Sequence, residues 1–138
     1  MKKYSFVIET KPIPKERPFF SMINAKPVIF TPKKTREFEQ FVCFTAKQYA
    51  PKDPLEGSIN IEIKFFFSPP KKLTRRNHNS FEGVPKNSRP DLDNLIKSIL
   101  DGLNSSGFWK DDSQITRLVA EKLWTDKEPR IEIIISTL

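Results

Sequence analysis

Residues 58–67 have the sequence SINIEIKFFF, in which every second side chain from Ile59 to Phe67 is apolar. Side chains of a β-strand alternate between its two faces, so this pattern predicts a strand with one face against a core. Residues 4–9 and 130–137 alternate in the same way, and residues 114–124 also favour a strand. A further short strand is expected at residues 28–30.

Two other segments carry apolar residues at three- and four-residue spacing, which indicates helices with one buried face. The first runs from about Lys34 to Tyr49 and the second from about Leu92 to Leu103. The expected buried faces are Phe38, Phe41, Val42, Thr45, Ala46 and Tyr49 in the first helix, and Leu92, Leu95, Ile96, Ile99, Leu100 and Leu103 in the second. Gly102 and Gly107 bracket the end of the second helix. We therefore predict one α/β (α+β) domain over residues 1–138, a mixed sheet of about four strands packed by two main helices.

The composition limits where the protein works. The chain has 138 residues, 37% of them apolar, which is enough to build a core without covalent crosslinks. The single cysteine, Cys43, excludes an intramolecular disulfide and fits a reducing compartment. No apolar run approaches the roughly 18–20 residues of a membrane span. We expect a cytoplasmic protein without a membrane partner.

Two segments without periodicity concentrate positive charge. Residues 11–18 contain three prolines and predict an extended basic arm, and residues 68–90 predict a mobile basic loop. The net charge is +7 over residues 1–36 and +5 over 71–90, but −2 over 37–70 and −3 over 91–138. A solvated surface and a polyanionic partner both explain this distribution, and charge alone does not separate them.

Acidic residues gather at the start of the second predicted helix and shortly after its end. Asp91 precedes the helix, Asp93 and Lys97 are four apart on one polar side, and Asp111-Asp112 follow downstream. Each feature alone has an ordinary explanation: an N-cap, a favourable helix dipole, a surface ion pair, or a solvated turn.

Together these acids favour a metal site. Carboxylates close to one another repel by about 4 kcal/mol per pair near a protein surface unless a cation joins them. Mg²⁺ prefers oxygen ligands and leaves positions open for a phosphate, whereas one His and one Cys make a zinc site improbable.

Three neighbouring runs of the chain carry this acidic cluster: Arg89-Pro90-Asp91-Leu92-Asp93-Asn94-Leu95-Ile96-Lys97, Leu100-Asp101-Gly102-Leu103-Asn104 and Gly107-Phe108-Trp109-Lys110-Asp111-Asp112-Ser113-Gln114-Ile115. Together they resemble the signature of RusA-like crossover junction endodeoxyribonucleases, the RusA-like Holliday junction resolvase family. The likeness extends more weakly to the arm, to residues 31–35 and to the final pair of strands. It implies that Asp91, Asp93 and Asp112 bind the metal and are catalytic, with Lys97 as the catalytic lysine. Asp111 is expected to support them.

The resemblance also implies a Mg²⁺-dependent homodimer that cuts branched DNA in recombination and repair, with Mn²⁺ as a possible substitute for Mg²⁺. Two symmetric cuts in a four-way junction require two identical sites, which a two-fold dimer provides. The candidate contacts to DNA phosphates are basic residues of the arm and of the loop, together with one lysine just before the first helix: Lys11, Lys15, Arg17, Lys33, Lys71, Lys72, Arg75, Arg76 and Arg89.

Two alternatives remain open at the level of sequence. One is a nuclease for flaps, forks or structured RNA, and the other is a DNA-binding module without catalysis. The complete set of carboxylates weighs against the second, because acids facing a polyanion do not help a simple binder. No small-molecule substrate is expected, and the family association suggests a bacterial or phage-encoded (prophage) protein.

Overall fold

The computed structural model describes residues 1–17, 19–30, 32–76 and 79–138. Its centre is a four-stranded sheet in the order β1-β6-β4-β5, formed by β1 (Lys3–Ile8), β4 (Ile59–Phe67), β5 (Ile115–Trp124) and β6 (Arg130–Thr137). β6 is antiparallel to β1 and β4, whereas β4 and β5 are parallel. The predicted mixed sheet of four strands is confirmed. Gln114, expected in the strand, instead ends the short 3-10 turn η1 (Asp112–Gln114).

The alternation of apolar residues builds one buried face of the sheet. Phe6, Ile133 and Ile63 lie opposite one another across β1, β6 and β4, and all three are buried. The intervening positions of β4 point to the other face, where Lys64 is exposed and Glu62 partly exposed, although Asn60 and Phe66 are buried. The core therefore lies on the side of the sheet that the helices cover.

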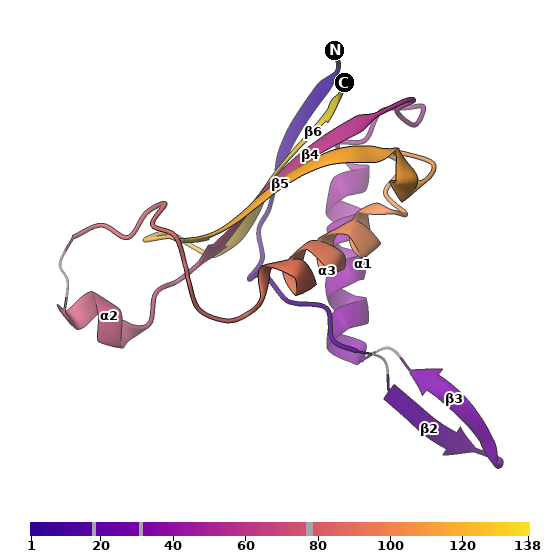
Figure 1. Ribbon diagram of the computed structural model, residues 1–138, viewed down its shortest axis with the longest axis horizontal. Coiled ribbons are helices and arrows are strands. Elements are labelled where there is room, and N and C mark those ends of the chain that lie inside the picture. Colours follow the sequence, from indigo (N-terminus) through magenta and orange to yellow (C-terminus); the bar gives the residue numbers. More distant parts are fainter. Residues whose placement is uncertain (18, 31, 77–78) are drawn as a thin grey trace.

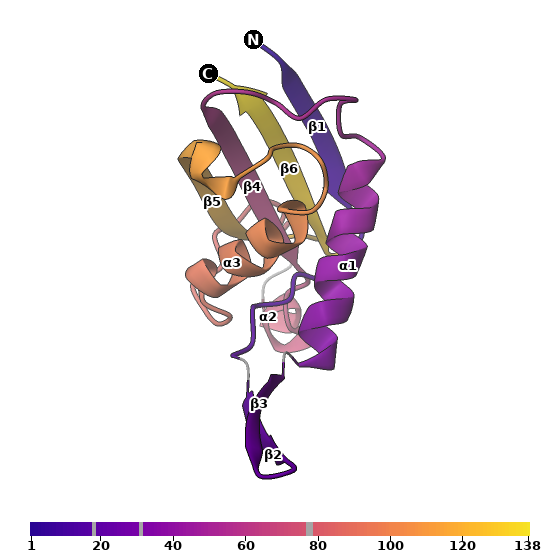
Figure 2. The same cartoon turned by 90° about the vertical axis from the view of Figure 1, so that its right-hand side faces the viewer.

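Helices α1 (Lys33–Lys47) and α3 (Leu92–Leu103) cover that face (Figures 1 and 2). Both predicted helices are confirmed, and Val42 of α1 packs beside Gly102 of α3. α3 ends at Leu103, between Gly102 and Gly107 as predicted, and the close approach of α1 leaves no room for a side chain at Gly102. No helix in the described ranges is both long and apolar enough to cross a membrane.

The predicted face of α1 was wrong at its margin. Phe38, Val42 and Ala46 are buried, but Phe41 is 43% exposed and Tyr49 is 48% exposed. The buried line steps by four residues along α1, so Phe41 falls on its flank and Tyr49 lies beyond the end of the helix.

A β-hairpin was missed. β2 (Phe19–Ile23) pairs antiparallel with β3 (Lys26–Phe30), and the hairpin projects away from the sheet (Figures 1 and 2). Only β3 was predicted. The turn residues Asn24 and Ala25 both have positive φ, 53° and 62°, as two-residue hairpin turns of type I′ require. Pro18, the last residue of the predicted arm, lies outside the described residues.

The arm is irregular as predicted, but it is held against the helices. The Lys15 backbone N–H donates to the carbonyl oxygen of Asn94 over 2.9 Å, and the Ser98 hydroxyl donates to that of Ile13 over 2.7 Å. The Lys15 ammonium also forms ion pairs with Glu39 of α1 and Asp101 of α3. The arm therefore links the two helices.

Residues 68–90 were predicted to form a loop without regular structure, but part of this segment is helical. It contains α2 (Lys71–Arg76), a helix too short to produce a periodic pattern in the sequence. Pro85 forms a β-bridge with Leu123 at the end of β5. Asn77 and His78 of the predicted loop lie outside the described residues, and the predicted mobility stays a prediction.

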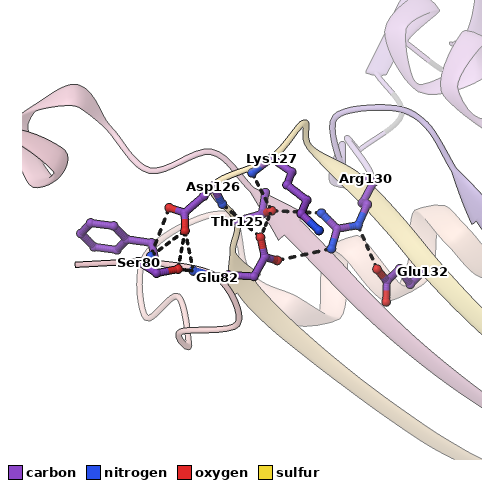
Figure 3. A network of polar contacts seen from close by, with 8 residues as sticks. Ser80, Glu82, Thr125, Asp126, Lys127, Arg130 and Glu132 are labelled. Carbon is purple, nitrogen blue, oxygen red and sulfur yellow. Dashed lines mark hydrogen bonds and ion pairs between the residues drawn. The ribbon is translucent and has the colours of Figure 1, made fainter. Parts of the chain in front are cut away.

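The downstream part of this segment is anchored to the turn between β5 and β6 (Figure 3). The Thr125 hydroxyl donates to the Glu82 carboxylate over 2.6 Å, and the Arg130 guanidinium lies 3.3 Å from the same carboxylate. Asp126 accepts from the Ser80 hydroxyl and from the backbone N–H of Phe81. These contacts fix the chain as it approaches α3.

Candidate active site

Two candidate acids lie at the start of α3. Asp91 occupies the N-cap position, and its carbonyl oxygen accepts the Leu95 N–H, but its side chain makes no capping hydrogen bond. The Asp93 carboxylate accepts only the N–H of the adjacent Asn94, over 2.9 Å, among the described contacts. Both acids are exposed. Capping therefore does not account for the Asp91 side chain.

Lys97 follows Asp93 by one helical turn and is also exposed. Among the described residues, no salt bridge joins it to Asp93, although their i,i+4 spacing would allow one. The surface ion pair that served as the ordinary explanation of this spacing is not formed. The Asp93 carboxylate and the Lys97 ammonium group therefore lie one turn apart on α3, and both charges are available to a ligand.

Two lysines hold the backbone that leads into Asp91. The Lys122 ammonium donates to the carbonyl oxygens of Ser88 and Pro90 over 2.7 and 2.8 Å. The Lys86 ammonium donates to the carbonyl oxygen of Arg89 over 2.6 Å. Lys86 is only 8% exposed, and burial, together with the charge of Lys122, holds its pKa below the usual value for a lysine. Three consecutive carbonyl groups thus face ammonium groups.

Sequence reasoning missed both of these positioning lysines. Lys86 resembled any other basic residue of the segment 68–90, and Lys122 lies on a strand remote from α3 in sequence. Only the pairing of Lys122 with the segment before α3 reveals its role.

Asp111 and Asp112 have different surroundings. The Asp111 carboxylate accepts the Ser113 N–H over 2.9 Å, and Gln114 completes a capping box around η1. These hydrogen bonds, above all the one from the Ser113 backbone, hold the pKa of Asp111 below its usual value. Asp112 accepts a long hydrogen bond, 3.4 Å, from the Asn104 side chain. Asp111 is engaged in the turn, and Asp112 is the more accessible to a ligand.

Asn104 ties Asp112 to the end of α3. Its side-chain oxygen accepts the Trp109 indole N–H over 3.1 Å, while its nitrogen donates to Asp112. Together with Lys110 and Asp111, these residues line a small cavity of about 210 Å³.

The structure does not bring Asp112 to Asp91 and Asp93 within one chain. Asn104 is thirteen positions after Asp91, which corresponds to roughly 20 Å at the 1.5 Å rise of an α-helix. In the described ranges, no three His, Cys, Asp or Glu side chains are grouped closely enough to hold a metal ion. One chain therefore presents two separate parts of the expected site, one at each end of α3.

The candidate DNA contacts occupy several elements. Lys11 and Arg89 line a cavity of about 430 Å³ beside the start of α3. Lys33 is exposed and lies 3.7 Å from Glu37, whereas Lys15 already has two carboxylate partners. Arg17, Lys71 and Lys72 are exposed. Arg75 and Arg76 belong to α2, but their side chains lie outside the described residues.

Comparison with known proteins identifies the family. Residues 9–136 match the family described as Endodeoxyribonuclease RusA. The chain is 30% identical over 134 residues to the Bacillus subtilis (strain 168) protein named "Uncharacterized protein YqaN", covering 94% of this chain and 93% of that protein. It is 49% identical over 51 residues, 37% of this chain and 38% of the relative, to a "Crossover junction endodeoxyribonuclease rusA" of Lactococcus phage r1t. The chain therefore belongs to the RusA family of endodeoxyribonucleases, hydrolases that cut the phosphodiester bonds of DNA.

Proposed function

We propose that this protein resolves four-way DNA junctions during recombination and repair as a Mg²⁺-dependent homodimer that makes two symmetric cuts. We further propose that each cut is made at a site shared between the two copies. The observation that carries the proposal is the separation of Asp91 and Asp93 from Asp112 by the length of α3. Nucleases of this family depend on a divalent metal ion, so these acids need to meet.

A two-fold axis across α3 would satisfy this requirement. Two α3 helices that lie antiparallel across such an axis place the start of one helix beside the end of the other. Each site would then combine Asp91 and Asp93 of one copy with the partner's Asp112. Leu92, Ile96 and Leu100, a line of partly buried apolar side chains along α3, are suited to such a contact.

The donor set fits a hard divalent ion. Asp91 and Asp93 are exposed carboxylates without a basic side chain paired to them in the described contacts, and acid oxygens favour Mg²⁺, or Mn²⁺ in its place, over Zn²⁺. A bound ion of this kind neutralises phosphate charge and lowers the pKa of a coordinated water. Lys97 would stabilise the negative charge that develops on the phosphoryl oxygens. The exposed residues Lys11, Arg17, Lys33, Lys71, Lys72 and Arg89 would bind the flanking phosphates.

The substrate is tested by incubating the protein with a labelled four-way junction, a flap, a fork and a linear duplex of matched sequence. Each is assayed with Mg²⁺, with Mn²⁺ and with EDTA, beside the variant Asp93→Asn. We expect paired symmetric nicks in the junction, lost in EDTA and in the variant. Preferential cutting of flaps or forks would reassign the substrate, and tight junction binding without any metal-dependent cut would leave a binding module.

The shared site is tested by combining two inactive variants. A dimer of one Asp93→Asn chain and one Asp112→Asn chain has one site with both substitutions and one site with neither, if the sites are shared. Co-expression at equal levels should thus restore about a quarter of the wild-type sites, by the statistics of random pairing in a two-fold dimer. Sites confined to one chain would leave every combination inactive, and a monomer in solution would exclude the dimer.

A further inference from the structure

We propose that the cavity of about 430 Å³ beside the start of α3 binds a single nucleotide of a DNA strand, with its phosphate on Lys11, Lys34 and Arg89. We call it the basic pocket. Five segments of the chain form it: the arm, the first turn of α1, the end of β4 with the residues that follow it, the segment that leads into α3, and the end of β5. The inference rests on the proposed function, because it takes DNA as the ligand.

Charge is the first argument. Lys11, Lys34, Lys86 and Arg89 all line the basic pocket, and no acidic residue does. In the described part of the chain, no salt bridge pairs any of these four side chains with a carboxylate. Cations from distant segments that converge without counter-charges repel one another, and a bound anion would relieve this repulsion.

Lys86 strengthens this argument because it is buried. Its ammonium donates to the Ser88 hydroxyl and the Arg89 carbonyl group, and it lies 4.5 Å from the Trp124 ring centroid. These contacts hold a positive charge at the wall of the pocket at a cost in hydration. The lowered pKa of Lys86 reflects that cost, and a phosphate in the pocket would offset it.

The size and walls of the pocket favour a nucleotide over a free phosphate ion. Between the basic groups the lining consists largely of proline rings, with Phe67 and Trp124 among the other apolar residues. A phosphate ion would leave these surfaces uncovered, whereas a sugar and base would cover them. Pro90 belongs to the wall of the basic pocket, and Asp91 follows it directly. A DNA strand with one nucleotide in the pocket would therefore also pass the acids at the start of α3.

Two tryptophans allow a direct test by NMR. Trp124 lines the basic pocket, and Trp109 lies at the far end of α3 beside Asp112, so their indole N–H signals report on different places. The signals are assigned by triple-resonance experiments, and 5′-phosphorylated tetrathymidylate is titrated in EDTA. We expect the Trp124 signal to move and the Trp109 signal to stay. A shift at Trp109 alone, or at neither indole, would overturn the inference.

Matched lysine variants test the phosphate contact. Lys34→Ala and Lys47→Ala remove the same charge from opposite ends of α1, and only Lys34 lines the basic pocket. Lys34→Ala should weaken tetrathymidylate binding several-fold and lower the slope of log affinity against log salt by about 0.7, the contribution of one contact to a single strand. Lys47→Ala should bind like the wild type. Equal effects of the two substitutions would contradict a specific contact.

Further measurements distinguish a nucleotide from a free phosphate as the ligand, and distinguish a failure of this inference from a failure of the proposed function. Inorganic phosphate that binds as tightly as tetrathymidylate would reduce the pocket to an anion site. If Trp124 is unaffected while the protein still nicks junctions with Mg²⁺, the inference fails and the nuclease stands. If Trp124 responds and Lys34→Ala weakens binding but no substrate is cut, the pocket stands and the proposed function fails.

Discussion

Lys122 on β5 donates a hydrogen bond from its ammonium group to the carbonyl oxygen of Pro90 over 2.8 Å. The next residue is Asp91, so a strand of the central sheet fixes the backbone that presents the first candidate acid. The same ammonium binds the carbonyl oxygen of Ser88. The rigid sheet, and not α3 alone, therefore positions this part of the site.

Replacing Lys122 by methionine should lower the rate of cutting at saturating DNA by about tenfold. The reason is that a displacement of roughly 1 Å in a positioned catalytic group already slows a reaction strongly. It should also lower the free energy of unfolding by about 1–3 kcal/mol through the loss of charge-assisted hydrogen bonds. Single-turnover kinetics and urea unfolding measure the two effects. Lys64→Met, at an exposed position of β4, is the control. A rate within twofold of the wild type would contradict a positioning role for Lys122.

Replacing Lys97 by methionine should reduce cutting by about 10²–10³-fold, the usual effect of removing one group that stabilises transition-state charge. Lys97 is exposed and has no salt bridge in the described contacts, so the midpoint of thermal unfolding should stay unchanged. Junction affinity, measured in EDTA, should fall only slightly. Lys97→Arg should retain part of the rate. Loss of stability in step with activity would indicate a structural role for Lys97.

The sequence patterns predicted the elements that bury an apolar face. Residues 58–67 and 92–103 show the spacing of a strand and a helix because burial selects apolar residues at every position of the inner face. The β2–β3 hairpin lacks this constraint, since most of the side chains described in it are at least partly exposed. Its signal was the two-residue turn at Asn24-Ala25, weakened by an alanine where glycine is usual.

The candidate site was predictable residue by residue, but its arrangement was not. Spacing in the sequence places Asp93 beside Lys97 on one helix, because the helix defines that distance. It does not reveal that Asp112 binds Asn104 at the other end of α3. The roles of Lys86 and Lys122 depend on contacts between remote segments, which no local pattern encodes.

Acid should weaken the anchor of the segment before α3. Hydrogen bonds from Thr125, then from the Asp126 backbone and Arg130, hold the pKa of Glu82 below its usual value. A carboxylate with a folded pKa below its unfolded value stabilises the fold above the unfolded pKa, and this contribution is lost as pH falls below about 4. Urea unfolding at about pH 6 and about pH 3, on either side of the usual carboxylate pKa, measures this effect. The fall in the free energy of unfolding between the two pH values should be smaller in Glu82→Gln than in the wild type. Glu128→Gln, at an exposed position, is the control and should keep the pH dependence of the wild type. If the wild type and both variants lose the same free energy of unfolding between these pH values, Glu82 does not anchor the segment.

The contact between α3 and α1 leaves no room for a side chain at Gly102. A Cβ atom there would lie 2.8 Å from both Cβ and Cγ1 of Val42, and 3.1 Å from the backbone oxygen of Glu39. Alanine favours a helix over glycine by about 1 kcal/mol, but overpacking usually costs about 1–3 kcal/mol and the Glu39 backbone has little freedom to move. Gly102→Ala should therefore lower the free energy of unfolding despite its better helix propensity.

The control for this substitution is Asn94→Ala, an exposed position of the same helix, which should change the free energy of unfolding by less than about 0.5 kcal/mol. Val42→Ala removes Cγ1 but keeps Cβ, so in that background Gly102→Ala should cost less than in the wild type without becoming neutral. A double-mutant cycle of urea unfolding measures this difference. If Gly102→Ala stabilises the wild-type protein, the helices do not approach as closely as this contact requires, and the spacing of α3 from α1 is set by other residues.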